Sequence, residues 1–444
     1  MPTGKTELTI ITESGRCSWA RCIFCSFSKK PYLPEPDFNR LKHQLDAKLT
    51  RQFDTLKYLN SGSFLDQNQI PKDFQKYLIQ KCLDLGIKQL IIESRPDHIT
   101  PANLKLLKDA NKNQKLKIYF ALGLETSDNE TLKKISKGIT TTDYQNAAAL
   151  LKKQGFYIRT YLMANLPYTK DIQKSLDDSV NFAQKHTDTI AIINTYPYGY
   201  APLFYMWLKK TWRPLDKSEF NTLVKKYRTD KKIDIYYDDY ISYPRFKNQT
   251  PLVGATKENL NNPIYDLWQD YIVRFYEKPE IKKYALFLPC AYRKPYSFSK
   301  THKQIIRHLK SLPFYANLHH LMISNPGIIP REFETKYPFA HYDWPEWEET
   351  PGIKKQYLKT TEDRIQNYLK THKYEKLFAY FKPDSESYTA LKSACKKQNL
   401  PLISCLDKNT YKDFKDNQKT PLTERRLLDA LTKTLRKHIN AKHD

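Results

Sequence analysis

Three cysteines lie within nine residues near the start of the chain, in the string ESGRCSWARCIFCSFS at residues 13–28. Cys17, Cys22 and Cys25 follow the spacing Cys-x4-Cys-x2-Cys. Thiols this close in sequence can bind a metal centre together, yet the fourth ligand that closes a structural zinc site is missing nearby. Three thiolates and one open position suit a four-iron, four-sulfur cluster, and a degenerate zinc knuckle is the alternative.

The residues around these thiols favour a shielded centre. Trp19, Ile23 and Phe24 stand between the cysteines and are expected to keep water away from it. The next thiol along the chain, Cys82, lies in a helical pattern of apolar residues. We therefore predict that Cys82 belongs to the core and is not a ligand.

A second group of reactive side chains occurs in the string LPCAYRKPYSFSKTH, residues 288–302. A thiol, a cation, a phenol, a hydroxyl and an imidazole follow one another there: Cys290, Lys294, Tyr296, Ser299 and His302. This set suits nucleophilic or acid–base chemistry on a polar heterocycle. Each residue also has an ordinary structural role, such as a buried thiol or a solvated lysine, and the residues alone leave both interpretations open.

Residues 1–200 alternate short β-rich runs with amphipathic segments. Six strands are predicted, at residues 7–14, 55–64, 87–95, 116–126, 155–167 and 189–199. Strands that alternate with helices favour a parallel sheet, either doubly wound or in an incomplete barrel. Active groups gather at the carboxyl ends of such strands, and six polar or small residues fall there: Ser61, Gly62, Glu93, Arg95, Glu125 and Asn165.

The rest of the chain predicts a second, smaller α/β domain. Residues 201–282 are irregular and rich in Tyr, Lys and Trp, so we predict an extension or linker there. Residues 283–410 form the predicted second domain, and residues 411–444 a basic C-terminal helix. Four strands are expected in that second pattern, at residues 282–290, 318–326, 375–381 and 400–406.

The formal net charge of +26, from 74 Lys and Arg against 48 Asp and Glu, favours a polyanionic partner such as RNA. The 32 tyrosines could stack on bases. A lysine-rich solvated surface is the plainer explanation of the same charge.

Composition also bounds the setting of the protein. The sequence has no apolar run long enough to span a membrane and no secretory signal at its start, so no membrane partner is expected. An odd number of cysteines, three of them clustered, argues against a secreted disulfide framework. We expect a protein of the reducing cytoplasm.

Further strings follow the cysteine loop in a fixed order: NSGSFLD at 60–66, IESRPDHIT at 92–100 and GLETSDNETLKKISKG at 123–138. With a cysteine loop after the first strand of a repeating βα scaffold, they make residues 8–200 resemble the radical S-adenosylmethionine (SAM) superfamily. Within it, they resemble the tRNA-acting, elongator-type branch. The usual spacing there is Cys-x3-Cys-x2-Cys, so this chain has one extra residue.

This resemblance implies a partial (βα)6 radical SAM barrel over residues 1–200. It implies a 4Fe-4S cluster held by Cys17, Cys22 and Cys25, and SAM held by the six residues at the strand ends. In that family an electron from the cluster cleaves SAM to a 5′-deoxyadenosyl radical, which abstracts hydrogen from an unactivated carbon. An electron donor, which the sequence does not identify, is then also a partner.

The second string matches the Pro-Cys-x3-Lys-Pro-Tyr-x2-Ser-x2-His signature of the archaeosine synthase core domain at every fixed position: Pro289, Cys290, Lys294, Pro295, Tyr296, Ser299 and His302. The string ISNPGIIPREFETKYPFAHYDWP at 323–345 resembles the continuation of that domain. The similarity covers residues 283–410. The first half is similar to the radical SAM partner of the same pathway, so the chain looks like the two joined.

For that pathway the resemblance implies two steps on tRNA that carries 7-cyano-7-deazaguanine in its D-loop. Free lysine, the co-substrate, adds to the nitrile through its side-chain amine, and the radical half then cleaves the lysine adduct to the formamidine of archaeosine. We expect Cys290 as nucleophile, His302 or Asp343 as proton shuttle, and Lys294 with Tyr296 to polarise the nitrile nitrogen or hold a phosphate.

The family usually carries additional transglycosylase-like and RNA-binding domains, for which this chain is too short. Recognition of the D-loop would then rest on the Tyr- and Lys-rich middle segment and the basic C-terminal helix. Two alternatives remain: a radical SAM tRNA-modifying enzyme of another kind, whose second half only binds RNA, and a non-catalytic RNA-binding protein with an iron–sulfur or zinc site.

Overall fold

The computed structural model describes residues 6–112, 114–237, 241–411 and 421–439. The chain divides into two compact units, Met1–Ser242 and Tyr243–Asp444, here called unit 1 and unit 2. The segment 201–282, predicted as one extension, therefore contributes to both units. None of the described helices combines the length and the apolar character needed to cross a membrane.

Unit 1 is built on a parallel sheet whose seven strands follow one another in chain order. They are β1 (Glu7–Ile11), β2 (Thr55–Leu59), β3 (Gln89–Ser94), β4 (Lys117–Glu125), β5 (Tyr157–Ala164), β6 (Thr189–Asn194) and β7 (Ile233–Tyr236). The first six confirm the predicted strands. Strand β7 was not predicted, because two isoleucines among charged residues give too short a signal.

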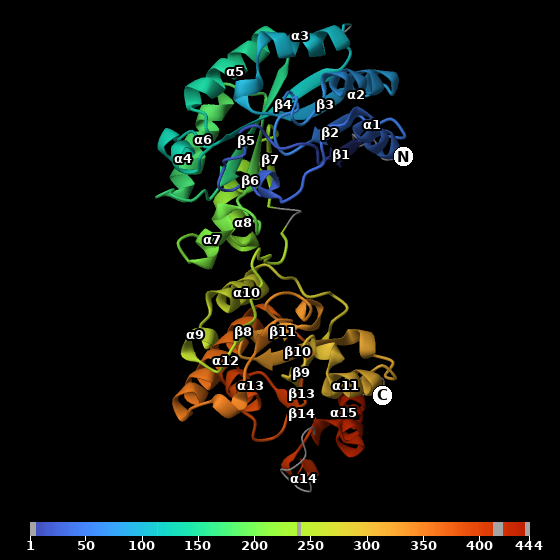
Figure 1. Cartoon of the computed structure of the whole chain (residues 1–444), viewed down its shortest axis with the longest axis vertical. Helices are drawn as coiled ribbons and strands as arrows, with labels where there is room; N and C mark the ends of the chain where they lie inside the picture. The colour runs from blue at the N-terminus through green and yellow to red at the C-terminus, as the bar shows by residue number, and fades with distance from the viewer. Residues whose placement is uncertain (1–5, 113, 238–240, 412–420, 440–444) are drawn as a thin grey trace. The chain divides into compact units, whose positions relative to one another are not determined.

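The helices of unit 1 lie around the outside of this sheet (Figure 1). They are α1 (Phe38–Lys48), α2 (Lys72–Asp84), α3 (Pro101–Ala110), α4 (Asn129–Lys134), α5 (Thr141–Lys153), α6 (Ile172–Gln184), α7 (Pro202–Leu208) and α8 (Lys217–Val224). Parallel crossovers are right-handed, and here each one leads to the next strand in the same direction. They therefore place their helices on one face, which gives a curled partial barrel and excludes the doubly wound alternative for this unit.

A polar network lies on the other face of the sheet, away from these helices. Lys57 of β2 pairs with Glu7 of β1 (2.7 Å) and donates to the Tyr236 hydroxyl of β7 (3.3 Å). Arg159 of β5 donates to the same hydroxyl (3.1 Å) and pairs with Asp234 (2.6 Å). Because β2 and β7 are far apart in the strand order, this contact shows how strongly the sheet curls.

Unit 2 has a five-stranded sheet of order β11-β10-β9-β13-β14 and a separate pair of short strands, β8 and β12. The bounds are β8 (Leu252–Val253), β9 (Tyr284–Pro289), β10 (Leu318–Ser324), β11 (Gly327–Pro330), β12 (Tyr342–Asp343), β13 (Lys376–Ala379) and β14 (Leu402–Ser404). The four predicted strands are present as β9, β10, β13 and β14. Strand β11 adds an antiparallel edge after a turn at Gly327, whose φ of +102° favours glycine.

The helices of unit 2 are α9 (Lys257–Leu260), α10 (Pro263–Arg274), α11 (Lys300–Leu309), α12 (Pro351–Thr371), α13 (Glu386–Lys397), α14 (Lys408–Tyr411) and α15 (Arg425–Ile439). The chain leaves β9 for β10 on one side and later returns to β13 on the other, so right-handed crossovers place α11 on one face and α12 with α13 on the opposite face. The strand order therefore reverses at β9, which makes the carboxyl end of β9 a topological switch point.

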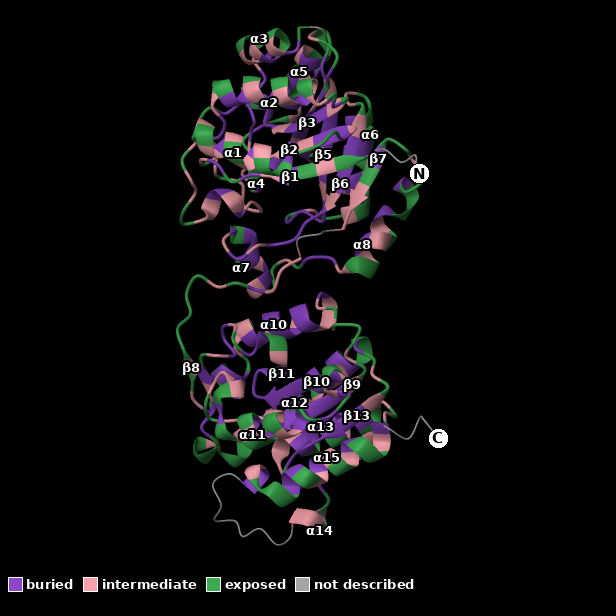
Figure 2. Cartoon of the chain, turned by 90° about the vertical axis from the view of Figure 1, so that its right-hand side faces the viewer, coloured by how far each residue is buried: buried purple, intermediate pink, exposed green. Residues whose placement is uncertain are grey.

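The predicted C-terminal helix is confirmed as α15 within the described residues, whereas residues 412–420 and 440–444 of that prediction lie outside them. Its leucines Leu427, Leu431 and Leu435 are fully buried, and α15 packs against α11. Figure 2 shows the resulting division into a buried and an exposed side. The basic helix is therefore part of the core of unit 2, and only its outer side is free for a partner.

We expect the Tyr236 hydroxyl to hold the last strand of the barrel in place. Hydrogen bonds to charged groups stabilise by about 1.5–3 kcal/mol when buried, and about 1 kcal/mol is expected at this partly exposed position. Tyr236→Phe should then raise the hydrogen-exchange rates of β7 amides about fivefold. Tyr157→Phe, on β5, is the control because Tyr157 makes its contacts through the ring, which stacks on Tyr119 (4.8 Å) and lies 5.7 Å from the Lys117 ammonium. Unchanged exchange in β7 would rule out this role.

Candidate active sites

A cavity of about 200 Å³ lies at the carboxyl edge of the sheet of unit 1. The three clustered thiols line it together with five of the six residues predicted at strand ends: Cys17, Cys22, Cys25, Ser61, Gly62, Glu93, Arg95 and Glu125. Asn165 does not line it. Sequence reasoning missed several residues that also face the cavity, chiefly Ser94, Lys137 and Tyr161.

The cysteine loop is held against the barrel by contacts along its whole length. The Ser18 amide donates to the buried Asp66 carboxylate (2.9 Å), and the Ile23 amide to the Ile135 carbonyl (3.1 Å). Gly15, with φ +59°, lies so close to the Asn68 carbonyl that a Cβ atom would stand 1.6 Å from its oxygen. The loop is thus fixed at both ends before any ligand binds.

Trp19 has a different role from the predicted shield. Its indole N–H donates to the Ser136 carbonyl (2.8 Å), and the guanidinium groups of Arg21 and Arg95 lie over the ring at 5.1 and 5.2 Å. A Cβ atom on Gly138 would stand 2.0 Å from the ring. Trp19 therefore ties the cysteine loop to residues 136–138. Of the three residues predicted to shield the centre, Trp19, Ile23 and Phe24, only Phe24 lines the cavity.

A buried ion pair crosses the floor of the cavity. The Lys137 ammonium lies 2.6 Å from the Glu125 carboxylate, and both side chains are nearly inaccessible. A break in strand register between Gly123 and Glu125, with φ +69° at Glu125, directs this carboxylate inward. Burial acts to lower the pKa of Lys137, but the charges of Glu125 and Cys22 and the hydrogen bond to Glu125 together outweigh it, and the pKa is raised. Burial raises the pKa of the Cys22 thiol to about 11.

The side chains of Glu93 and Asn165 each form hydrogen bonds to the backbone, Glu93 at the cavity and Asn165 outside it. The Glu93 carboxylate accepts the amides of Asn60 (3.1 Å) and Ser61 (2.8 Å), and burial raises the pKa of Glu93 against the effect of these bonds. Ser61 itself has φ +55°. The Asn165 amide instead donates to the Arg213 carbonyl (2.9 Å), so Asn165 supports the segment after α7.

The residues around the cavity fit a 4Fe-4S cluster with SAM. Among the described residues no three His, Cys, Asp or Glu side chains converge on a point where one metal ion could bind, and a cluster does not require this because each thiolate binds a different iron. Ser28 Oγ is buried at the cavity without a partner in the described part of the chain, which leaves a polar group for a ligand. Gly123 keeps the cavity open, since a Cβ there would stand 2.5 Å from Glu125 Oε1.

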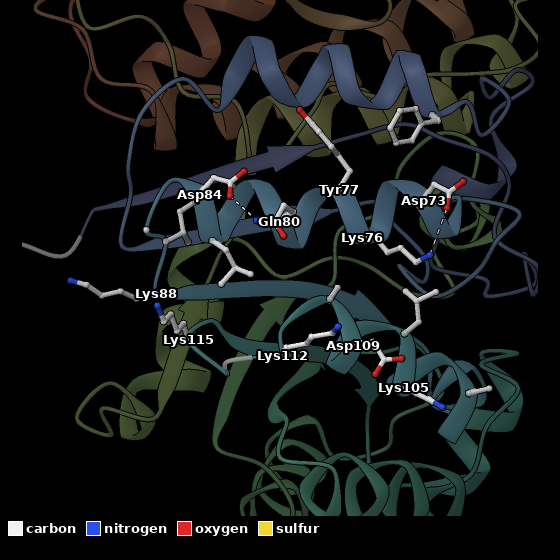
Figure 3. Close-up of a pocket in the computed structure, with 17 residues that line it drawn as sticks. Asp73, Lys76, Tyr77, Gln80, Asp84, Lys88, Lys105, Asp109, Lys112 and Lys115 are labelled. Atoms are coloured by element: carbon white, nitrogen blue, oxygen red, sulfur yellow. Dashed lines mark hydrogen bonds and ion pairs between the residues drawn. The ribbon is translucent and has the colours of Figure 1, made fainter.

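A larger hollow of about 1290 Å³ between α2 and α3 lacks these features (Figure 3). Lysines and aspartates line it, and Lys76 lies 4.0 Å from Asp73. Neither cysteine nor histidine is among its lining residues. The smaller cavity is therefore the candidate active site of unit 1.

In unit 2, Cys290 follows β9 directly and so stands at the topological switch point. The Tyr296 hydroxyl donates to its sulfur (3.8 Å), and the Tyr342 hydroxyl lies 3.7 Å from the sulfur. The two phenols also form a hydrogen bond with each other. Burial, and then the nearby Cys290 thiol, raises the pKa of both phenols well above 10, so both stay protonated and can donate.

Lys294 and Asp343 complete the group around the thiol. The Lys294 ammonium is almost fully buried, lies 4.3 Å from the centroid of the Tyr342 ring and 3.9 Å from Asp343 Oδ1. The Asp343 side chain is 29% exposed, which allows it to exchange protons with solvent. The structure thus brings together Cys290, Lys294, Tyr296 and Asp343.

His302 and Ser299 hold the backbone beside the thiol. Ser299 Oγ accepts the His302 amide (3.1 Å) and so caps α11. His302 Nε2 donates to the Pro289 carbonyl (2.9 Å), and Nδ1 accepts from Arg331 (3.0 Å). Burial and the Arg331 charge lower the pKa of His302 to about 3. With both ring nitrogens engaged and the ring neutral, His302 is suited to positioning Pro289 and Cys290 and not to shuttling protons.

Three further residues of the site were not identified from the sequence: Tyr342, Arg331 and Glu334. Glu334 accepts from Arg331 (2.9 Å) and from the Ser297 amide (3.1 Å), which fixes the loop after Cys290. All three lie in the string at 323–345, which resembles the archaeosine synthase core domain, but only Asp343 of that string was predicted as a site residue.

We expect unit 2 to lose stability as the pH falls below about 6.5. The unfolded chain then takes up a proton on His302, whose pKa of about 3 in the folded unit prevents this. His320 and His372, whose pKa values burial also lowers, act in the same direction. The urea concentration at which unit 2 becomes sensitive to protease should therefore be lower at pH 5 than at pH 7. His302→Asn should reduce this difference between pH 5 and pH 7. His308→Asn, on the same helix, should leave the difference unchanged. If His302→Asn also left it unchanged, His302 would not be a cause of the pH dependence.

Comparison with known proteins agrees with two domains of different origin. Residues 13–178 match the radical SAM superfamily, which uses a 4Fe-4S cluster and SAM, and residues 266–419 match a domain of unknown function, DUF5591. Among solved structures, the Elp3 protein of Methanocaldococcus infernus, with an N-terminal deletion, is similar over 56% of this chain and 58% of its own, with 16% identity and a TM-score of 0.35.

Several curated relatives match the chain, among them two archaeosine synthase subunits. Archaeosine synthase subunit beta of Methanosarcina acetivorans is 29% identical over 201 residues, which are 42% of this chain and 56% of the relative. Archaeosine synthase subunit alpha of Thermoplasma acidophilum is 33% identical over 159 residues, 35% of this chain and 29% of the relative. The matches thus span about half of one relative and less than a third of the other. The chain joins a domain of the radical SAM superfamily to a DUF5591 domain and is homologous to archaeosine synthase subunits beta and alpha.

Proposed function

We propose that this chain forms archaeosine in tRNA in two steps, one at each candidate site. The Cys290 site adds the side-chain amine of lysine to the nitrile of 7-cyano-7-deazaguanine in the D-loop. The cysteine-lined cavity of unit 1 then breaks the nitrogen–carbon bond on the lysine side of the adduct. The observation that carries this proposal is the presence of both sites, each with its own family match, in one chain. The net charge of +26 suits an RNA substrate.

The first step uses the Cys290 thiolate as nucleophile. It attacks the nitrile carbon and forms a thioimidate, and the nitrile nitrogen takes up a proton. The lysine amine then attacks the same carbon, the carbon–sulfur bond breaks, and the thiolate returns. The amine loses one proton as the amidine forms, so the net reaction is an addition without a leaving group.

Neighbouring groups supply and accept the protons of this step. Tyr296 and Tyr342 stay protonated, the Tyr296 hydroxyl donates to the sulfur, and the Tyr342 hydroxyl lies 3.7 Å from the sulfur. We expect one of these hydroxyls to donate to the nitrile nitrogen as charge develops there. Asp343, partly exposed and paired with Lys294, accepts the proton that the amine loses. His302 keeps the backbone of Pro289 in place.

The second step depends on residues of the unit 1 cavity. Cys17, Cys22 and Cys25 would hold the cluster, and Glu125 with Lys137 offers opposite charges to the amino and carboxylate groups of SAM. When bound, cluster and SAM supply the radical that breaks the nitrogen–carbon bond. Phe24 and Tyr161 narrow the cavity, which limits the access of water.

Nucleoside mass spectrometry tests the whole proposal. Cyano-deazaguanine tRNA incubated with lysine and this protein should yield the lysine adduct, and addition of SAM with a reductant under anaerobic conditions should convert the adduct to archaeosine. Absence of both nucleosides would defeat the proposal. SAM cleavage without any adduct would instead indicate a radical SAM enzyme whose second half only binds RNA.

Replacement of Cys290 by Ala should abolish adduct formation, since it removes the proposed nucleophile. The same variant should still release 5′-deoxyadenosine when it is given SAM, reductant and tRNA that already carries the adduct. Cys395→Ala is the matched control because Cys395 is buried in the core of unit 2. Normal adduct formation by Cys290→Ala would eliminate the thioimidate.

Replacement of Cys22 by Ala should have the opposite effect. Loss of one cluster ligand should remove the iron bound after anaerobic reconstitution, about four atoms per chain in the intact protein, while lysine addition continues. The adduct should therefore accumulate when lysine, SAM and reductant are all present. Cys82→Ala, at a fully buried thiol of the barrel core, should retain its iron. Full iron content in Cys22→Ala would place the cluster elsewhere.

A further inference from the structure

Exposed aromatic rings are confined to a few segments of each unit. Although the sequence has 32 Tyr, 21 Phe and 6 Trp, the large aromatic side chains that stand exposed in the described ranges are few. They are Tyr32, Tyr168, Tyr205, Tyr292, Phe298 and Trp347. Tyr32 follows the cysteine loop, Tyr168 follows β5 and Tyr205 lies on α7, while the other three rings follow Cys290 or Asp343 in the sequence.

In unit 2 the exposed rings accompany the residues around Cys290. Tyr292, 77% exposed, comes two residues after the thiol, and Phe298, 52% exposed, ends the one-turn helix whose first residue, Tyr296, contacts the sulfur. Trp347, 76% exposed, follows Asp343 by four residues. Burying such rings is favourable by about 25 cal/mol per Å², so their exposure marks a surface that a partner covers.

The charges beside these rings indicate what that partner is. Arg293 and Lys300 are exposed and close in sequence to Tyr292 and Phe298, whereas Trp347 lies between the exposed Glu346 and Glu348 and is not part of this pattern. Rings that alternate with cations suit a strand of RNA, whose bases stack on aromatic faces while its phosphates meet Lys and Arg. Aromatic rings and Arg also occur in protein interfaces, and the net charge of +26 favours RNA as the partner.

Unit 1 presents the same combination at the carboxyl edge of its sheet. Tyr168 follows β5, has φ +71°, which is unusual for a bulky residue, and has the Lys134 ammonium 6.0 Å from its ring centroid. Tyr205 lies on α7, where the Leu203 amide donates to the Ile23 carbonyl of the cysteine loop (3.0 Å). The strained backbone at Tyr168 thus carries a ring that is exposed to solvent, and an exposed ring is accessible to a ligand.

We infer that the exposed rings at each site stack on unpaired nucleobases of the RNA and hold the nucleotides beside the target base away from their pairing partners. The inference rests on the proposed function and adds to it how the substrate is bound. A base that reacts at Cys290 or in the unit 1 cavity must leave its stack, and the rings replace the stacking that it and its neighbours lose.

RNA binding measured by fluorescence anisotropy with the full chain tests this. The probes are a labelled D-arm hairpin with guanine at the target position and a fully paired duplex of the same length. The double variant Tyr292→Ala with Phe298→Ala should bind the hairpin at least about thirtyfold more weakly and the duplex almost unchanged, since stacking contributes about 1 kcal/mol or more for each of the two bases. Tyr292→Phe should retain hairpin binding, which shows that the ring is responsible.

Ile281→Ala is the matched control, because Ile281 is an exposed apolar residue before the amino end of β9, at the opposite edge of the sheet from Cys290. Hairpin binding by the double variant within twofold of the parent, or equal losses on hairpin and duplex, would overturn the inference. So would a parent protein that does not bind the hairpin.

The binding assay contains no lysine, SAM or cyano base, so it separates this inference from the proposed function. Ring-dependent hairpin binding by a protein that forms neither adduct nor archaeosine would support the inference and defeat the proposed chemistry. If the protein forms the adduct and archaeosine but its hairpin binding does not depend on the rings, the proposed function would be supported and the inference would be overturned.

Discussion

The convergence of parallel strands at one edge of a sheet places every reactive group of this protein. In unit 1, right-handed crossovers that always advance in one direction curl the sheet and bring the ends of β2, β3 and β4 around one small cavity. In unit 2, the chain reverses direction at β9 and leaves Cys290 at the point of reversal. Two different ways of winding the same βα unit therefore produce a small cavity lined by three thiols in one case and a single reactive thiol at a switch point in the other.

Buried charges then fix the backbone at both edges. A buried charge without a partner is costly, so the pairs Glu125–Lys137 and Glu334–Arg331 admit few alternative arrangements of the loops that carry them. The second pair extends through the neutral ring of His302 to the Pro289 carbonyl. These contacts therefore hold the Cys290 thiol in position although the thiol itself makes none of them.

The amino-acid sequence predicts the strands and their chemistry better than it predicts contacts between distant residues. Glu93 and Glu125 were found because each ends a β-rich run, and Cys290 because its neighbours form an unusual string. Lys137 follows a helix, and only the folded barrel shows that it faces Glu125. Tyr342 lies 52 residues from Cys290, so no local pattern predicts that its hydroxyl approaches the sulfur. Strand β7 gives no clear signal because its two isoleucines stand among charged residues, and β11 because it begins only three residues after β10 ends.

The two proposed steps need opposite treatment of water, and this explains why two sheets serve better than one. Addition to a nitrile requires protons to enter and leave, and the Cys290 site has a partly exposed carboxylate in Asp343 for this purpose. Radical chemistry requires that water and stray hydrogen donors be excluded, and the unit 1 cavity is small, with a buried ion pair among its lining residues. The proposed function assigns one of these two demands to each site. In that proposal the RNA presents the same nucleotide to each site in turn, and a nucleotide held out of its helix by stacking on exposed rings at both sites needs no change in its own conformation between the two steps.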